Sequence, residues 1–84
     1  MYEIIFDEKA IEELNKLPHE KKKRIFEKII STKKKPFHFF KKLKGRKDYR
    51  LRVGDYRVIA DINKDKQMIE VTLIRHRKNV YRDL

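Results

Sequence analysis

Apolar residues recur along the chain with two different periods, and the change between them divides the chain into two halves. The first half contains apolar residues that recur every three or four positions and so lie on one face of an α-helix: Ala10, Ile11, Leu14 and Leu17. From Asp48 onward the period becomes two, which is typical of strands with one buried face. The sequence therefore predicts an α+β fold with the helices before most of the strands.

The helical half is expected to begin with a short strand. Residues 2–6 are β-branched or aromatic at most positions, and Asp7 after them is a residue type that caps helices. Pro18 ends the first helix and opens a second one, and Pro36 is expected to stop that second helix. The apolar positions of the second helix again have helical spacing: Ile25, Phe26, Ile29 and Ile30.

Three strands are expected in the second half. Their predicted bounds are residues 49–53, 56–62 and 68–74. A glycine-first loop, Gly54-Asp55, separates the first two strands and is a strong hairpin signal, and a polar turn at residues 63–67 separates the second pair. Together with the N-terminal strand, this antiparallel meander should form one small sheet packed on the two helices, within a single domain of residues 1–84.

The aromatic segment Phe37-His38-Phe39-Phe40 between the two halves has two interpretations. Its rings can stack on nucleic-acid bases. They can also close the core, which is the reading that we favour because a chain of 84 residues needs large side chains to bury enough surface.

Charge narrows the class of partner. Lys and Arg number 24 against 13 Asp and Glu, so the net charge is +11 and no pairing of acids with bases can cancel it. Surface ion-pair networks of heat-adapted proteins need both signs and do not explain the excess. A polyanion explains it better, either nucleic acid or an acidic protein, whereas no segment is apolar and long enough to dock on a lipid surface.

Several protein classes are not expected from this sequence. There is no cysteine, so neither a disulfide nor a thiolate metal site can form, and no metal or cofactor is predicted. Residues 1–4 do not resemble the start of a secretion signal, and no uninterrupted apolar run is long enough to span a membrane. We therefore expect a cytoplasmic protein that does not bind membranes.

A basic run occupies the second predicted helix and the residues after it. Two interpretations stay open at this point: a solvated outer face, or a surface that follows a phosphate backbone. The run consists of Lys21, Lys22, Lys23, Arg24, Lys28, Lys33, Lys34 and Lys35.

Three arginines of the predicted hairpin are expected on one face of the sheet. A two-residue loop sets Arg52 directly opposite Arg57 and Arg50 across from Ile59. Like charges placed across a strand pair destabilise it by roughly a few tenths to 1 kcal/mol, so folding alone gains nothing from the arrangement. A bound phosphate would turn the repulsion into a charge-assisted grip. The alternative is a solvated face whose arginine stems cover apolar surface.

The order of these motifs resembles the RelE/ParE toxin superfamily. The matching segments are Leu43-Lys44-Gly45, the hairpin from Tyr49 to Ile59, and the block from His76 to Tyr81. The resemblance spans nearly the whole chain and implies a RelE-like fold. It also implies a toxin of a type II toxin–antitoxin system that cuts messenger RNA on the ribosome and is neutralised by an acidic, RelB-like antitoxin.

The resemblance also assigns roles to residues. The family's basic catalytic positions correspond to Arg50, Arg52 and Arg57, and its C-terminal arginine and tyrosine correspond to Arg77 and Tyr81. Some members carry lysines where this chain has Arg50 and Arg52, and arginine is a poor proton donor because it stays charged. Neighbouring basic residues are predicted to bind RNA: Lys44, Arg46, Arg75 and Lys78.

Metal-independent cleavage of RNA needs a base for the 2′-hydroxyl, positive charge on the phosphate and an acid for the departing 5′-oxygen. The arginines can supply the charge. His76 and Tyr81 are the candidates for proton transfer, with His76 as the base or as a phosphate-positioning group. Both have alternative structural roles, at a strand end for His76 and as C-terminal packing for Tyr81.

Two other functions fit the same residues. One is inhibition of DNA gyrase, as in the ParE-type branch of the superfamily, which shares the fold without cutting RNA. The other is a non-catalytic module that binds RNA or the ribosome. The arginine cluster together with His76 and Tyr81 favours RNA cleavage.

Overall fold

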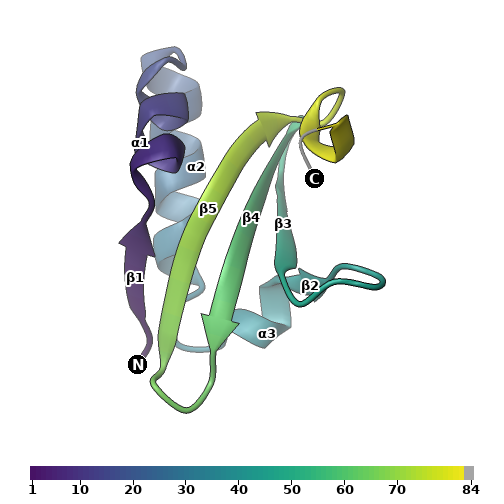
Figure 1. Ribbon diagram of the computed structural model, residues 1–84. Coiled ribbons are helices and arrows are strands. Elements are labelled where there is room, and N and C mark those ends of the chain that lie inside the picture. Colours follow the sequence, from purple (N-terminus) through teal and green to yellow (C-terminus); the bar gives the residue numbers. More distant parts are fainter. Residues whose placement is uncertain (83–84) are drawn as a thin grey trace.

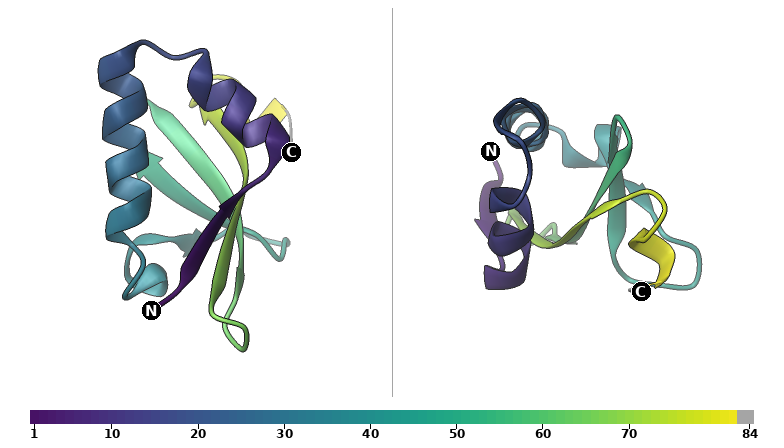
Figure 2. Two further views of the ribbon diagram at one scale, coloured as in Figure 1. Left: turned by 90° about the vertical axis from the view of Figure 1, so that its left-hand side faces the viewer. Right: turned by 90° about the horizontal axis from the view of Figure 1, so that it is seen from above.

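A five-stranded sheet forms one layer of the protein, and two helices cover one of its faces (Figures 1 and 2). The computed structural model describes residues 1–82 except for the side chain of Tyr81. The strands are β1 (Glu3–Phe6), β2 (Lys41–Lys42), β3 (Tyr49–Val53), β4 (Tyr56–Asn63) and β5 (Met68–His76). The helices are α1 (Glu8–Asn15), α2 (His19–Ser31) and the short α3 (Pro36–Phe39), and a 3₁₀ helix, η1 (Val80–Arg82), follows β5. The predicted α+β architecture is confirmed.

The sheet has the strand order β1-β5-β4-β3-β2, with one parallel pair. β3, β4 and β5 form the expected antiparallel meander, and β1 lies parallel to β5, with Ile4 opposite Ile69. Sequence analysis missed β2, because its two lysines carry no alternation of apolar and polar residues. This strand pairs only with Tyr49 and Arg50 of β3.

The predicted end of the second helix was wrong. α2 ends at Ser31, five residues before Pro36. The hydroxyl of the buried Thr32 donates a hydrogen bond to the carbonyl of Ile29 at 2.6 Å, and such local side-chain bonds compete with continuation of the helix. Pro36 begins α3 instead of stopping α2. Asp7 does hold the position that caps α1, but its side chain makes no capping hydrogen bond.

The main core lies between the helices and the sheet. Ala10, Ile25 and Ile29 from the helices meet Val58 and other sheet residues that are fully enclosed. The aromatic segment is divided between core and surface. Phe40 is only 2% exposed, whereas Phe37 is 40% exposed and contacts the ring of Tyr49 edge-on at 5.5 Å between centroids.

A second, smaller apolar cluster lies on the face of the sheet that the helices leave uncovered. Ile59 and Leu73 point to this face, and Val80 from η1 and Leu43 from the loop before β3 pack against them. Figure 2 shows η1 on the side of the sheet opposite the helices. We call this side of the sheet the far face. The apolar cluster covers only a small part of the far face, and charged residues occupy most of the remaining positions.

Three carboxylates gather at one end of the far face. Asp61 and Glu70 are direct cross-strand partners, and Asp7 precedes α1 next to the paired end of β1. A hydrogen bond with the Asp7 side chain and the negative charge of Asp7 raise the pKa of the Glu70 carboxyl, and burial and the charge of Asp61 act in the same direction.

This raised pKa predicts how stability depends on pH. Below the ordinary pKa of a glutamate, Glu70 is protonated in the folded and in the unfolded protein, and its contribution to stability is complete. This contribution is lost as the pH rises through the raised pKa of Glu70 in the folded protein. Replacing Glu70 with Gln should therefore leave a protein that is more stable than wild type near neutral pH, with the difference shrinking toward pH 4. Urea denaturation of both proteins across this range measures it, with Glu3→Gln, an exposed glutamate of β1, as control. An equal stability difference at every pH would contradict the prediction.

Candidate nucleic-acid interface

The turn between β3 and β4 sets the geometry of the far face. Gly54 has φ +58° and Asp55 does not have a positive φ, as expected for a two-residue hairpin turn that begins with glycine. The register places Arg52 directly opposite Arg57 and Arg50 opposite Ile59. The predicted pairing of the arginines is therefore confirmed.

β5 extends this pairing by a third strand. Arg75 lies directly opposite Arg57, so that Arg52, Arg57 and Arg75 occupy one row across β3, β4 and β5. We call these three residues the arginine row. They share the far face with Ile59, while Val58 and its neighbours on the other side face the helices. Arg50 lies two positions from Arg52 on the same face of β3.

A bulge in β5 brings Arg75 into the row. Ala60 pairs with Val71 but Ile59 pairs with Leu73, so Thr72 is an extra residue, and its hydroxyl donates to the Ile59 carbonyl at 3.3 Å. Without this bulge, Ile74 instead of Arg75 would face Arg57. Sequence reasoning treated Arg75 only as a flanking RNA-binding residue because alternation alone does not reveal the extra residue.

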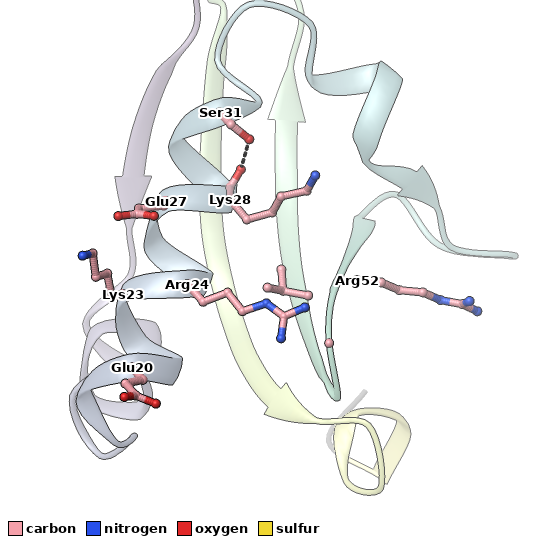
Figure 3. A pocket seen from close by; sticks show the side chains of 9 residues that line it. Glu20, Lys23, Arg24, Glu27, Lys28, Ser31 and Arg52 are labelled. Carbon is pink, nitrogen blue, oxygen red and sulfur yellow. Dashed lines mark hydrogen bonds between the residues drawn. The ribbon is translucent and has the colours of Figure 1, made fainter.

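The members of the row are held differently. The Nη1 of Arg57 donates to the carbonyls of Gly54 at 3.0 Å and Tyr56 at 2.9 Å, which holds its guanidinium over the turn. Arg75 pairs with the carboxylate of Glu13 on α1. Arg52 is exposed, and Figure 3 shows its side chain pointing away from α2. The row therefore combines fixed and solvent-directed positive charges.

Arg77 lies beside the tip of the same hairpin. Its backbone N–H donates to the carbonyl of Asp55 at 2.7 Å, and its Nε is 4.0 Å from the Asp55 carboxylate, with both side chains largely exposed. Lys78, the next residue, is also exposed. The structure thus brings Arg77 and Lys78 to the end of the sheet where the arginine row lies.

The loop before β3 contributes further basic residues. Leu43 anchors it to the small apolar cluster, and Lys44 is exposed beside Gly45, which has φ +73°. Arg46 makes two hydrogen bonds to Asp48, at 2.9 and 3.0 Å, which lower the pKa of the Asp48 carboxyl and raise that of Arg46. Lys44 is therefore better placed to bind phosphate than Arg46, whose charge is neutralised within the loop.

His76 is not brought together with the arginine row. It pairs with Tyr56 on the helix side of the sheet, and the two rings meet edge-on with centroids 5.4 Å apart. Its Nδ1 accepts a hydrogen bond from the Lys78 backbone N–H at 3.2 Å, which assigns the proton of the neutral ring to Nε2. This tautomer suits donation from Nε2 better than the base role that the sequence suggested. The side chain of Tyr81 lies outside the described residues.

A groove of mixed charge lies on the other side of the hairpin edge, between α2 and β3 (Figure 3). Arg24 and Lys28 extend from α2 toward the strands, and the guanidinium of Arg24 covers Gly54, where an added Cβ would lie 3.1 Å from it. Glu20 and Glu27 also line this groove. Arg52 of the arginine row lines the same groove from β3, although its side chain points away from α2.

Comparison with known protein families identifies the fold. A model of the ParE toxin of the type II toxin–antitoxin system parDE matches residues 4–81. The chain belongs to this toxin family. A search of curated proteins found no match. The membership makes the chain a type II toxin of the RelE/ParE fold, as the hairpin and the C-terminal block predicted.

Solved structures of RelE toxins resemble this toxin along most of its length. The toxin–antitoxin complex RelBE2 from Mycobacterium tuberculosis has a chain with a TM-score of 0.83 and 22% identity, and the match covers 89% of this toxin and 96% of that chain. The archaeal RelE–RelB complex from Pyrococcus horikoshii matches with a TM-score of 0.78, 28% identity, and coverage of 90% and 94%. The isolated RelE toxin of E. coli matches with a TM-score of 0.77 and 22% identity over both entire chains.

No helix within residues 1–82 of this toxin is long and apolar enough to cross a membrane.

The geometry of the arginine row predicts that the toxin does not need these residues for folding. Arg52→Ala removes one side of a like-charge pair, so the free energy of unfolding should stay equal or rise by about a few tenths of a kcal/mol. Arg57→Ala relieves the same pair but loses two bonds to turn carbonyls, so its stability should fall by about 1 kcal/mol at most. Urea denaturation measures both changes. Unfolded variants would instead show that the row is structural.

Proposed function

We propose that this toxin is a ribosome-dependent endoribonuclease that cleaves messenger RNA at the arginine row. The observation that carries the proposal is the concentration of Arg52, Arg57 and Arg75 across three strands, with Arg50 beside them. Opposed arginines of this kind weaken a sheet, and a phosphodiester lying among them would bring negative charge to several of them at once. The structural similarity to RelE toxins supports the same function.

The proposed reaction is attack of a ribose 2′-hydroxyl on the adjacent phosphorus. The bond from phosphorus to the 5′-oxygen breaks, which leaves a 2′,3′-cyclic phosphate on one product and a 5′-hydroxyl on the other. The proton of the 2′-hydroxyl leaves as the new bond forms, and the 5′-oxygen gains a proton. The guanidinium groups stabilise the phosphate while it carries additional negative charge. Arg50 and Arg77, at the two ends of the site, extend the positive surface along the RNA.

Proton transfer is assigned to the C-terminal block. His76 with its proton on Nε2 can donate a hydrogen bond toward RNA at the end of the sheet, and Tyr81 remains the second candidate for proton transfer or for stacking on a base. In this proposal the ribosome orients the messenger, because His76 lies on the other side of the sheet from the arginine row.

The partner of the free toxin is proposed to be an acidic, RelB-like antitoxin. The net charge of +11 favours an acidic chain that covers the basic surface. The RelE neighbours from Mycobacterium tuberculosis and Pyrococcus horikoshii are themselves complexes with RelB.

Removing one guanidinium from the row should reduce cleavage without reducing folding. We expect Arg52→Ala or Arg57→Ala to lower the rate of messenger cleavage by roughly 10²-fold or more, as is typical when a group that stabilises transition-state charge is lost. Translation in vitro with mapping of messenger 5′ ends measures the rate. Arg24→Ala is the matched control, because it removes the same charge from a residue of α2 that borders the hairpin turn but does not belong to the arginine row. Equal losses for Arg24→Ala and Arg52→Ala would show that only net charge matters.

Naked RNA should be a poor substrate. Pure toxin at ordinary concentrations is expected to cut a messenger slowly unless programmed ribosomes are present, and ribosomes should accelerate cleavage by several orders of magnitude through orientation. A gel assay with and without ribosomes tests this. Rapid cleavage of free RNA would contradict the ribosome dependence, while binding with a steep salt dependence and no product would favour a non-catalytic RNA-binding module.

A second candidate function is inhibition of DNA gyrase. The family model that matches this chain is that of the ParE toxin, and the ParE-type branch has the same fold. The same translation assay separates the two functions when it is paired with a gyrase supercoiling and DNA-cleavage assay. Gyrase-dependent DNA breaks without new messenger ends would replace the proposed function with this one.

A further inference from the structure

Glu13 connects the helical layer to the arginine row. One carboxylate oxygen, Oε1, accepts a hydrogen bond from the backbone N–H of Ile74 at 3.1 Å, and the carboxylate also pairs with the guanidinium of Arg75. The side chain of Glu13 is only 10% exposed and that of Arg75 is 23% exposed. The carboxylate is therefore fixed at two adjacent residues of β5.

The topology explains why a helix residue reaches this position. β1 pairs with β5 only as far as Val71, and α1 continues beside the rest of β5 (Figure 1). The N–H of Ile74 lies on the edge of β5 that β1 leaves uncovered, and Glu13 satisfies it. The neighbouring residue, Arg75, belongs to the far face by register, and its guanidinium meets the same carboxylate.

The electrostatics of the arginine row explain what this contact does. Arg57 has an arginine opposite it on each side, so the row carries two like-charge pairs that share one residue. A carboxylate on Arg75 reduces the repulsion at one end of the row. It makes the same kind of contact that a phosphodiester makes, because guanidinium binds carboxylate and phosphate oxygens with one set of donors.

We propose that Glu13 is an internal counter-ion for Arg75, and that RNA phosphate competes with Glu13 for this guanidinium when the toxin binds its substrate. The inference rests on the proposed RNA-binding function of the row. In the free protein Glu13 stabilises the end of β5. In the complex Arg75 turns to the phosphate, and the Ile74 N–H retains Glu13 as its acceptor. Glu13 thereby limits RNA affinity while it stabilises the unbound toxin.

The test measures binding instead of cleavage. The probe is a single-stranded RNA oligonucleotide with 2′-O-methyl riboses, which cannot undergo 2′-hydroxyl attack, and fluorescence anisotropy gives its affinity at several salt concentrations. Glu13→Gln keeps an oxygen acceptor for the Ile74 N–H but removes the charge that holds Arg75. We expect this variant to bind roughly threefold to tenfold more tightly, with the slope of log K against log salt steeper by about 0.7, as for one more phosphate contact on a single strand.

Two controls separate competition from net charge. Glu12→Gln makes the same charge change at the adjacent, exposed residue of α1 and should leave the slope unchanged. In an Arg75→Ala background, Glu13→Gln should no longer alter the slope. The proposal is overturned if Glu13→Gln behaves like Glu12→Gln, if it binds RNA more weakly, or if its effect persists without Arg75.

A measurement on the wild-type toxin needs no variant and covers the case in which Glu13→Gln does not fold. The NMR signals of the Glu13 carboxyl carbon and the Arg75 Nε–H should shift when the oligonucleotide saturates the toxin, while that of the Glu12 carboxyl carbon should not. Unchanged Glu13 and Arg75 signals at saturation would overturn the proposal, as would an absence of RNA binding. Binding with these shifts but no cleavage of natural messenger would sustain the inference and remove only the proposed reaction.

Discussion

The register of the β3–β4 hairpin decides which side chains can act together in this toxin. A shift of one residue would move Arg52 and Arg57 to the helix side and bring Val53 and Val58 to the surface. The two-residue turn at Gly54 and Asp55 prevents this shift, and burial of the valines against the helices opposes it further. The positions of the arginines are therefore consequences of how the core is packed. The site costs the sheet some stability, and the core on the other face compensates for it.

The basic residues of α2 and those of the arginine row lie on different layers of the protein, and Arg52 alone among the row borders the α2 groove. Lysines of α2 lie around a groove that contains Glu20 and Glu27, and part of their charge is balanced there. Asp61, Glu70 and Asp7 lie at the end of the far face away from the hairpin tip. Among the described residues its positive end has few acids of its own, and Glu13, which pairs with Arg75, comes from the helical layer. Both surfaces are basic, so the net charge of the protein does not distinguish the groove beside α2 from the far face.

The sequence predicted the parts of the fold that depend on local period and turn chemistry. The two helices, the three-strand meander and the Arg52–Arg57 pair all follow from the spacing of apolar residues and from a glycine-first turn. The parts that it missed depend on contacts between distant segments. The two lysines of β2 become a strand only because Tyr49 and Arg50 lie beside them, and the parallel pairing of β1 with β5 has no local signal. The bulge at Thr72 likewise forms within the β4–β5 pair, and it exchanges Ile74 for Arg75 opposite Arg57.

His76 shows why adjacency in sequence is a weak guide to a shared site. It lies between Arg75 and Arg77, yet alternation along β5 turns it to the face opposite Arg75, against the ring of Tyr56. In the proposed function, a group in that position would reach RNA on the far face only around the end of the sheet, between β5 and η1. The proposed reaction therefore assigns charge stabilisation to the arginines and proton transfer to residues at this end of the sheet. A site organised in this way is well suited to a substrate whose reactive geometry is imposed by a larger assembly, since electrostatic stabilisation acts on whatever phosphate that assembly presents.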